Sequence, residues 1–183
     1  MSKNELEKIW DCGVDLPYRE KVERLQNIIA ENFKDKVDLP EEGRRVVYPS
    51  STKYNHYFSD GLYIREMFCE KGYLCFSVIH NTANPLFVMK GSVLISSEDG
   101  VKELTAPTFV LTEPGTKRVL YFTEDSVLVN VHPNPDGLTD LEEIEKKMYC
   151  SEWEQYDDDL KQDVWQMLEH KDYCKKKENE ENK

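Results

Sequence analysis

The sequence predicts a mainly β protein, a small antiparallel barrel or sandwich with an N-terminal helix and C-terminal helices. Three observations support this fold class. About eight short apolar runs follow one another at spacings of 8 to 14 residues between residues 62 and 132. Turn residues separate the runs, as at Asp99-Gly100 and Pro114-Gly115. No helical periodicity lies between them, so an antiparallel sandwich or barrel is favoured over a parallel α/β sheet.

The composition narrows the functions that are open to the chain. It has 183 residues, enough for one domain with its own core, and a formal net charge of -12. An acidic surface repels phosphate backbones, so we expect no nucleic-acid partner. The first eight residues are polar and no run approaches the ~20 apolar residues of a membrane span, so we expect no signal peptide, no membrane association and a cytoplasmic protein. Five cysteines without a C-x-x-C pair predict reduced thiols.

Changes in pattern along the chain predict four segments. Residues 1–44 form an N-terminal helical arm, residues 45–135 the β-barrel, residues 136–170 the C-terminal helices, and residues 171–183 a disordered charged tail.

The N-terminal arm contains one clear helical pattern. Residues 1–17 mix a few apolar side chains with charges and indicate a docking arm or a short helix. Apolar residues then recur at helical spacing and predict an amphipathic helix over residues 18–33, in a stripe made of Val22, Leu25, Ile28, Ile29 and Phe33. The stripe must pack either on the barrel or on a second subunit.

The barrel begins with a short strand and an aromatic segment. We expect a strand over residues 45–48 and a surface loop over residues 50–61, where His56 faces solvent. The remaining strands are predicted at Leu62–Phe68, Tyr73–His80, Leu86–Ser96 with an interruption at Lys90-Gly91, Val101–Leu104, Phe109–Thr112, Lys117–Phe122 and Ser126–His132.

Two of these strands carry informative local signals. Alternation over Tyr73–His80 predicts that Val78 and His80 share one face with Leu74 and Phe76. Asp-Gly at residues 99–100 predicts a two-residue hairpin turn.

Two helices are predicted after the barrel. The sequence from Thr139 to Glu142 has the form of a capping box, which predicts a helix beginning at Thr139 and ending near Tyr149. A second amphipathic helix is predicted over residues 152–170.

The strands between residues 62 and 132 resemble the cupin superfamily of small jelly-roll barrels. The first cupin motif runs from a glycine through H-x-H and a glutamate to a final glycine. With Gly91 as that glycine, Asn84 stands at the glutamate position and Val78 and His80 at the two histidines. The second motif is similar around Gly115, with Glu113 at the proline position and Arg118 at the histidine position.

This resemblance implies a barrel that has lost its metal. Only His80 keeps a ligand residue type among the four positions, and the permanent charge of Arg118 opposes a divalent cation. We therefore expect no metal and no cofactor. His132, Asn130 and His56 are the remaining residues that could rebuild a site, although nothing in their spacing requires it.

The resemblance also implies a ligand site inside the barrel. Its expected binding residues are His80, Asn84, Arg118, Asn130 and His132. Arg118 with His80 favours a carboxylate, a phosphate or a sugar acid. The alternative is that Arg118 pairs with Glu113 or Glu124 and that His80 is a satisfied core residue.

A narrower resemblance links the chain to short cupin-like proteins of tailed bacteriophages. It rests on residues 98–107, 114–118, 123–132 and 139–142, and it implies a place in the host cytoplasm or the virion. The leading hypothesis is a metal-free, non-enzymatic binding or assembly module that forms a homo-oligomer, with a dimer favoured.

Other functions stay open beside this hypothesis. One is a protein that binds a small anionic or sugar-type molecule. Another is a sugar epimerase or isomerase that uses His80, Tyr121 and Tyr63, which are available by residue type. A metal dioxygenase is disfavoured by the count of ligands. Whether the chain is an enzyme is left open, with the balance against it.

Overall fold

The computed structural model describes residues 16–32, 47–48, 52–150 and 152–162, together with residues 4, 7 and 10. The chain divides into two compact units, Met1–Ser151 and Glu152–Lys183. The second unit is helical over residues 153–162, within the range predicted for the last helix. The predictions for residues 163–183 and most of those for residues 1–15 fall outside the described residues. The first unit holds the barrel.

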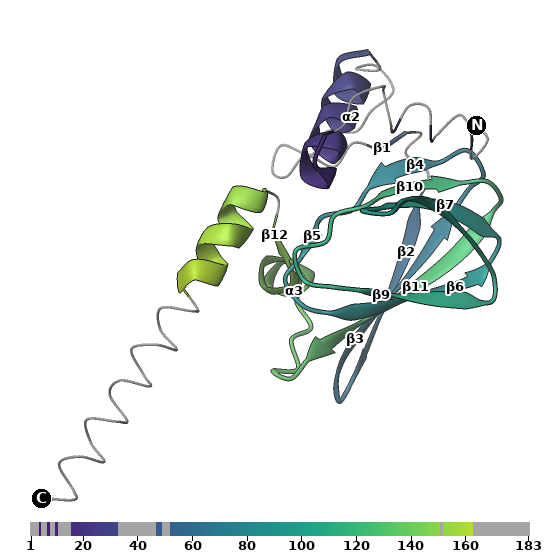
Figure 1. Ribbon diagram of the computed structural model, residues 1–183. Helices are drawn as coiled ribbons and strands as arrows, with labels where there is room; N and C mark the ends of the chain where they lie inside the picture. Colours follow the sequence, from purple (N-terminus) through teal and green to yellow (C-terminus); the bar gives the residue numbers. More distant parts are fainter. Residues whose placement is uncertain are drawn as a thin grey trace, which may run out of the picture. The chain divides into compact units, whose positions relative to one another are not determined.

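Two five-stranded antiparallel sheets form the barrel (Figure 1). The first sheet has the order β1 (Val47–Tyr48), β4 (Leu74–Phe76), β10 (Val119–Phe122), β7 (Ser92–Ser97) and β8 (Gly100–Thr105). The second has the order β2 (Lys53–Ser59), β3 (Gly61–Cys69), β11 (Ser126–Asn134), β6 (Asn84–Lys90) and β9 (Thr108–Thr112). A short pair joins β5 (Ile79–His80) to β12 (Tyr149–Cys150). Apart from the hairpins β2–β3 and β7–β8, the chain passes back and forth between the two sheets, which is the jelly-roll arrangement, so the predicted fold class is confirmed.

The core lies between the two sheets because their inward faces are apolar. Along β11 buried and half-buried residues alternate, as expected for a strand with one face toward a core. The inward side chains form one cluster, which includes Met67, Leu86, Val88, Val93, Ile95, Leu120, Phe122 and Leu128.

Gly91 is the point at which the chain passes from the second sheet to the first. It separates β6 from β7, as the sequence predicts, and has a φ of +79°. A Cβ at this position would lie 2.3 Å from Ser126 Oγ and 2.5 Å from the Asp125 carbonyl oxygen. Glycine is therefore required both by the backbone angle and by the close approach of the neighbouring strand.

Helix α2 (Tyr18–Asn32) confirms the predicted N-terminal helix. Val22 and Leu25 of its apolar stripe are buried. The Tyr18 hydroxyl donates to the Lys117 carbonyl oxygen at 2.6 Å and lies 3.1 Å from Ser96 Oγ. These bonds anchor the first turn of α2 on the first sheet. In the described residues no helix is long and apolar enough to cross a bilayer.

The aromatic segment predicted as a surface loop is instead strand β2. Lys53–Ser59 pairs with β3 along its whole length. His56 is half-buried, and its Nδ1 lies 2.8 Å from the Tyr63 hydroxyl, so the solvent-facing prediction for His56 is wrong. The inward residues of β2 are aromatic rather than aliphatic, which makes the alternation hard to recognise in the sequence.

The strand predicted over Tyr73–His80 breaks into β4 and β5. Ser77 interrupts it, since its backbone N–H donates to the Arg118 carbonyl oxygen at 2.8 Å and its Oγ accepts from the Arg118 backbone N–H at 2.9 Å. Phe76, Ser77 and Val78 consequently all face the barrel interior, and the predicted strict alternation fails here.

The helix after the barrel is α3 (Leu141–Met148). Its N-cap is Asp140 and not the predicted Thr139, because the Asp140 carboxylate accepts from the backbone N–H groups of Glu142 and Glu143. Ile144 and Met148 of α3 pack on Tyr63. The helix ends one residue before Tyr149, which enters β12 and pairs with His80.

Candidate functional site

A small cavity of about 50 Å³ lies inside the barrel between the two sheets. Polar groups interrupt its apolar wall at several points. The lining residues that carry them are Tyr54, Arg65, Tyr73, Ser77, His80, Thr112, Arg118 and Asn130. No aspartate or glutamate is among the lining residues, so the cavity is bordered by two guanidinium groups without a carboxylate to balance them.

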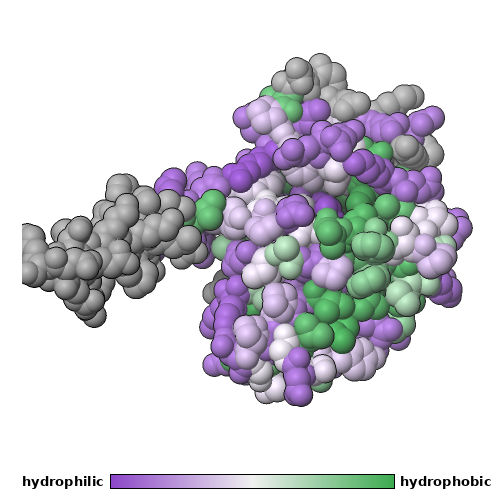
Figure 2. All heavy atoms as spheres, turned by 60° about the horizontal axis from the view of Figure 1, so that its bottom comes forward, coloured by the Kyte–Doolittle hydropathy of each residue, from purple (hydrophilic) through white to green (hydrophobic). Residues whose placement is uncertain are grey.

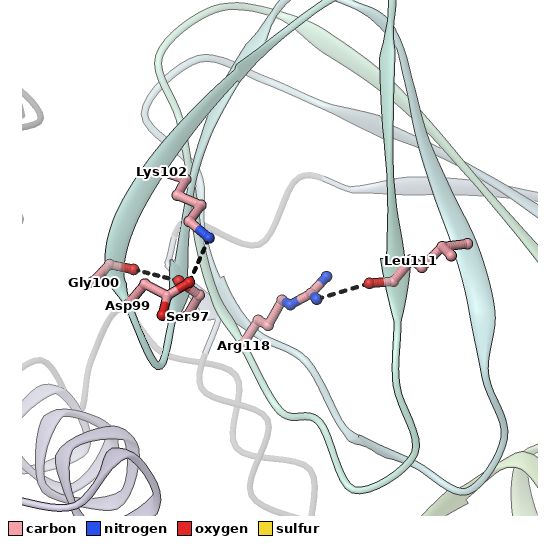
Figure 3. A network of polar contacts seen from close by, with 6 residues as sticks. All are labelled: Ser97, Asp99, Gly100, Lys102, Leu111 and Arg118. Atoms are coloured by element: carbon pink, nitrogen blue, oxygen red, sulfur yellow. Dashed lines mark hydrogen bonds and ion pairs between the residues drawn. The ribbon is translucent and has the colours of Figure 1, made fainter.

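Arg118 directly precedes β10 of the first sheet, and its side chain is held against β9 of the second sheet. Its guanidinium donates to Thr112 Oγ1 at 3.1 Å and to the Leu111 carbonyl oxygen at 3.2 Å, the latter bond being visible in Figure 3. Within the described residues it makes no ion pair, so the alternative in which Arg118 pairs with Glu113 or Glu124 is wrong. Burial lowers the pKa of Arg118, but a guanidinium stays protonated at neutral pH.

Arg65 projects into the barrel from the inner face of β3, between Tyr63 and Met67. Its side chain is only 6% exposed, and its Nε has no hydrogen-bond partner among the described residues. The guanidinium lies over the Tyr149 ring at 5.3 Å and near the Tyr54 ring at 5.8 Å. These rings stabilise the cation through their faces, yet no carboxylate in the described structure lies within ion-pair distance of it.

His80, Asn84 and Asn130 form one buried hydrogen-bonded chain from three strands. Asn130 Nδ2 of β11 donates to Asn84 Oδ1 of β6 at 3.1 Å. The Asn84 amide therefore presents its Nδ2 to His80 Nδ1 of β5, at 3.0 Å. Because Nδ1 of His80 accepts this bond, the proton of the neutral imidazole is on Nε2.

His132 lies directly behind His80. The two imidazoles are stacked with centroids 5.7 Å apart, and His132 Nε2 lies within hydrogen-bond distance of the Tyr149 hydroxyl, at 3.1 Å. His132 is fully buried and its Nδ1 has no partner in the described structure. Burial, and secondly the charge of Arg65, lowers the pKa of His132 to about 3, so this imidazole is neutral at pH 7.

The five residues predicted to bind a ligand all lie in this region. His80, Arg118 and Asn130 line the cavity, Asn84 bonds to two of them, and His132 stacks on His80. Their role in binding stays a prediction.

The sequence analysis missed Arg65 and Tyr149. Arg65 had no clear signal, since it alternates with Tyr63 and Met67 while Leu62, Ile64 and Phe68 make the opposite face of the predicted strand at least as apolar. Tyr149 had none, because its position depends on the pairing of β12 with β5.

The residues of this site do not fit a divalent metal. The described residues contain no group of three histidine, cysteine or acidic side chains that could hold one. The lone pair of His80 Nδ1 is already engaged by Asn84, and Val78 offers no donor. Two guanidiniums at the same cavity would repel a cation.

Comparisons with known proteins find similarity in solved structures only. No family model matches the chain, and no curated protein matches it. A cupin superfamily protein of Desulfitobacterium hafniense has 9% identity over 46% of this chain and 78% of its own, with a TM-score of 0.41. The cupin-2 domain of an XRE family transcriptional regulator of Enterobacter cloacae has 10% identity over 46% of this chain and 100% of its own, with a TM-score of 0.41.

An acetylacetone dioxygenase of Acinetobacter johnsonii has 17% identity over 59% of this chain and 78% of its own, with a TM-score of 0.39. Similarities of this size assign neither a family nor an activity to the chain.

Proposed function

We propose that the protein is a non-enzymatic binding module that holds a small anion inside its barrel, between Arg65 and Arg118. One observation carries the proposal: two guanidiniums border one cavity whose lining includes no carboxylate. The predicted phage origin is a separate matter and adds nothing to this site.

The energetics of Arg65 favour an anionic occupant. A buried charge without a partner is costly, and real proteins pair such charges or bind counter-ions to them. Arg65 is nearly fully buried with a free Nε, and the aromatic rings beside it offset only part of its lost hydration. A carboxylate or an oxyanion in the cavity would accept hydrogen bonds from Arg65 and would place its negative charge near Arg118.

The size of the cavity limits the ligand to a small group. One water needs about 10–15 Å³ of such space, so about 50 Å³ accommodates roughly three to five atoms of water size. Formate, acetate and phosphate are of this size. A nucleotide sugar is far too large for a space of about 50 Å³.

The epimerase alternative is weakened by where its residues lie. A base of that kind needs a carboxylate to orient it, whereas His80 is oriented by the Asn84 amide. Leu120 of β10 lines the cavity, so the adjacent Tyr121 projects from the opposite face of the strand and cannot act as an acid in the interior.

Anion-dependent stabilisation of the full chain tests the proposal. Thermal unfolding is measured with sodium formate, acetate and phosphate, each against sodium chloride at equal ionic strength. A ligand at 100 times its dissociation constant adds about 2.7 kcal/mol of stability. We expect at least one of the three anions to stabilise the wild type. In Arg118→Gln the dissociation constant of that anion, obtained from the stabilisation, should be at least tenfold higher.

Arg24→Gln is the matched control, because Arg24 is an exposed arginine of α2 remote from the cavity lining. It should behave as the wild type. Absence of stabilisation by all three anions at 10 mM or so, about the concentration for a weak site, would refute the proposal. Equal stabilisation of Arg118→Gln and Arg24→Gln would also refute it.

A further inference from the structure

The outer face of the second sheet is apolar, although this face points away from the barrel core. Antiparallel sheets with one solvated face normally place polar residues there. Here the outward residues of β9, β6 and β11 are all apolar: Phe109, Leu111, Pro85, Phe87, Met89, Val127, Val129 and Val131. We call this surface, with its continuation over β3, the apolar sheet face.

The apolar sheet face is open in the described structure. Leu111 is 61% exposed, Met89 59% and Phe109 58%. Figure 2 shows hydrophobic side chains gathered on one side of the barrel, the side where β3, β9 and β11 lie in Figure 1. A contiguous apolar patch of this kind marks an interaction surface rather than ordinary exposure of single residues.

Charge is nearly absent from this face although the chain is strongly acidic. The formal net charge of the chain is -12. Among the outward residues of β3, β6, β9 and β11, the only carboxylate is that of Glu66, which accepts hydrogen bonds from Asn55 Nδ2 at 2.9 Å and the Tyr57 hydroxyl at 3.0 Å. Two acidic molecules can therefore meet at this face without bringing like charges together.

The extent of the face suits one side of a stable dimer. The four strands of the face, about 4.8 Å apart, span ~19 Å, and seven residues of β3 at about 3.4 Å each span ~24 Å. The flat area is then roughly 460 Å², and the accessible area of the ridged side chains is larger. A standard interface takes about 800 Å² from each partner.

We infer that the apolar sheet face docks on the same face of a second copy of this chain, forming a symmetric dimer. Face-to-face packing of two sheets buries outward apolar residues at about 10 Å separation, as in a β-sandwich. The polar group of Asn55, Tyr57 and Glu66 on β2 and β3 then lies toward the rim, as interfaces commonly arrange. A two-fold interface uses the same patch on both subunits, so no further surface is required.

Sedimentation equilibrium of the full chain tests this inference. The monomer mass is 21.5 kDa, and we expect the wild type to sediment with twice that mass at micromolar concentration. Leu111→Glu and Met89→Glu each place a carboxylate on the face, twice per dimer, and each should weaken association at least about 100-fold. Both positions are more than half exposed, so both variants should keep the wild-type circular dichroism spectrum.

Leu141→Glu is the matched control. Leu141 is 39% exposed but belongs to α3, outside the apolar sheet face, so this variant should stay dimeric. A wild type that is monomeric at 100 µM or so, a concentration that reveals weak dimers, would overturn the inference, whether another segment of the chain or a foreign protein covers the face. An oligomer that survives both face variants would overturn it too.

Discussion

The imidazole of His132 lies parallel to that of His80, with ring centroids 5.7 Å apart and an angle of 6° between the planes. The two rings differ in their partners. His80 Nδ1 accepts from the Asn84 amide, whereas His132 Nε2 shares a hydrogen bond with the Tyr149 hydroxyl. The stack therefore links the hydrogen-bonded chain of His80, Asn84 and Asn130 to Tyr149 of the β5–β12 pair.

Stability should fall in mild acid because of His132. Its pKa is about 3 in the folded protein, owing to burial and then to Arg65, against 6.5 as the ordinary value. Between these values the unfolded chain binds a proton that the folded protein does not, so stability is complete above pH 6.5 and decreases as the pH falls toward 3. The slope is at most about 1.4 kcal/mol per pH unit, or about 2 kcal/mol between pH 6.5 and 5.

Urea unfolding at pH 7 and pH 5 measures this loss, and His132→Gln should lose substantially less between the two pH values. An equal loss in the wild type and the variant would show that other groups are responsible.

Asn84→Asp should reverse the protonation of the His80 ring. The amide donates to His80 Nδ1, but a carboxylate can only accept, so Nδ1 must then carry a proton. Nitrogen-15 NMR of the imidazole distinguishes the two states. The wild type should show the proton on Nε2 alone, and a wild type already protonated on Nδ1 would contradict the assigned bond.

Gly91→Ala should destabilise the protein more than Gly61→Ala. Both glycines have positive φ, +79° and +72°, so both substitutions carry the left-handed strain of roughly 1 kcal/mol. At Gly91 the added Cβ also meets Ser126 and the Asp125 backbone, while at Gly61 nothing lies within 4 Å. Overpacking of this kind typically adds about 1–3 kcal/mol. Equal free energies of unfolding for the two variants in urea would contradict this, because they would mean that residues 125 and 126 move away from the added Cβ at no cost in stability.

Asp140→Ala should cost about 1 kcal/mol of stability, and Thr139→Ala much less. The Asp140 carboxylate accepts from two backbone N–H groups at the start of α3, at 2.9 and 3.1 Å. Urea unfolding of the two variants compares them directly. A larger loss for Thr139→Ala would restore the capping box that the sequence suggests.

Local patterns predicted most of the strands correctly. Turn signals predicted the β7–β8 hairpin and the interruption at Gly91, although the two turn residues are Glu98 and Asp99 and not the predicted Asp99 and Gly100, because Ser97 pairs with Gly100. These features depend on neighbours in the sequence, so the sequence reveals them. The break of the Tyr73–His80 strand was missed because it depends on Arg118, a partner far along the chain.

The sequence by itself determined an antiparallel sandwich or barrel and the position of most of its turns, because apolar runs and turn residues are encoded locally. The resemblance to cupins added the jelly-roll class and the expectation that His80 and Arg118 point inward. Only the tertiary structure decided which groups share the cavity. Arg65 and Arg118 line the same cavity, and Tyr149 comes to lie beside His80 and His132, through pairings between strands distant in the chain. The balance of charge inside the barrel follows from those long-range pairings, since a sequence specifies which residues are charged but not which of them meet.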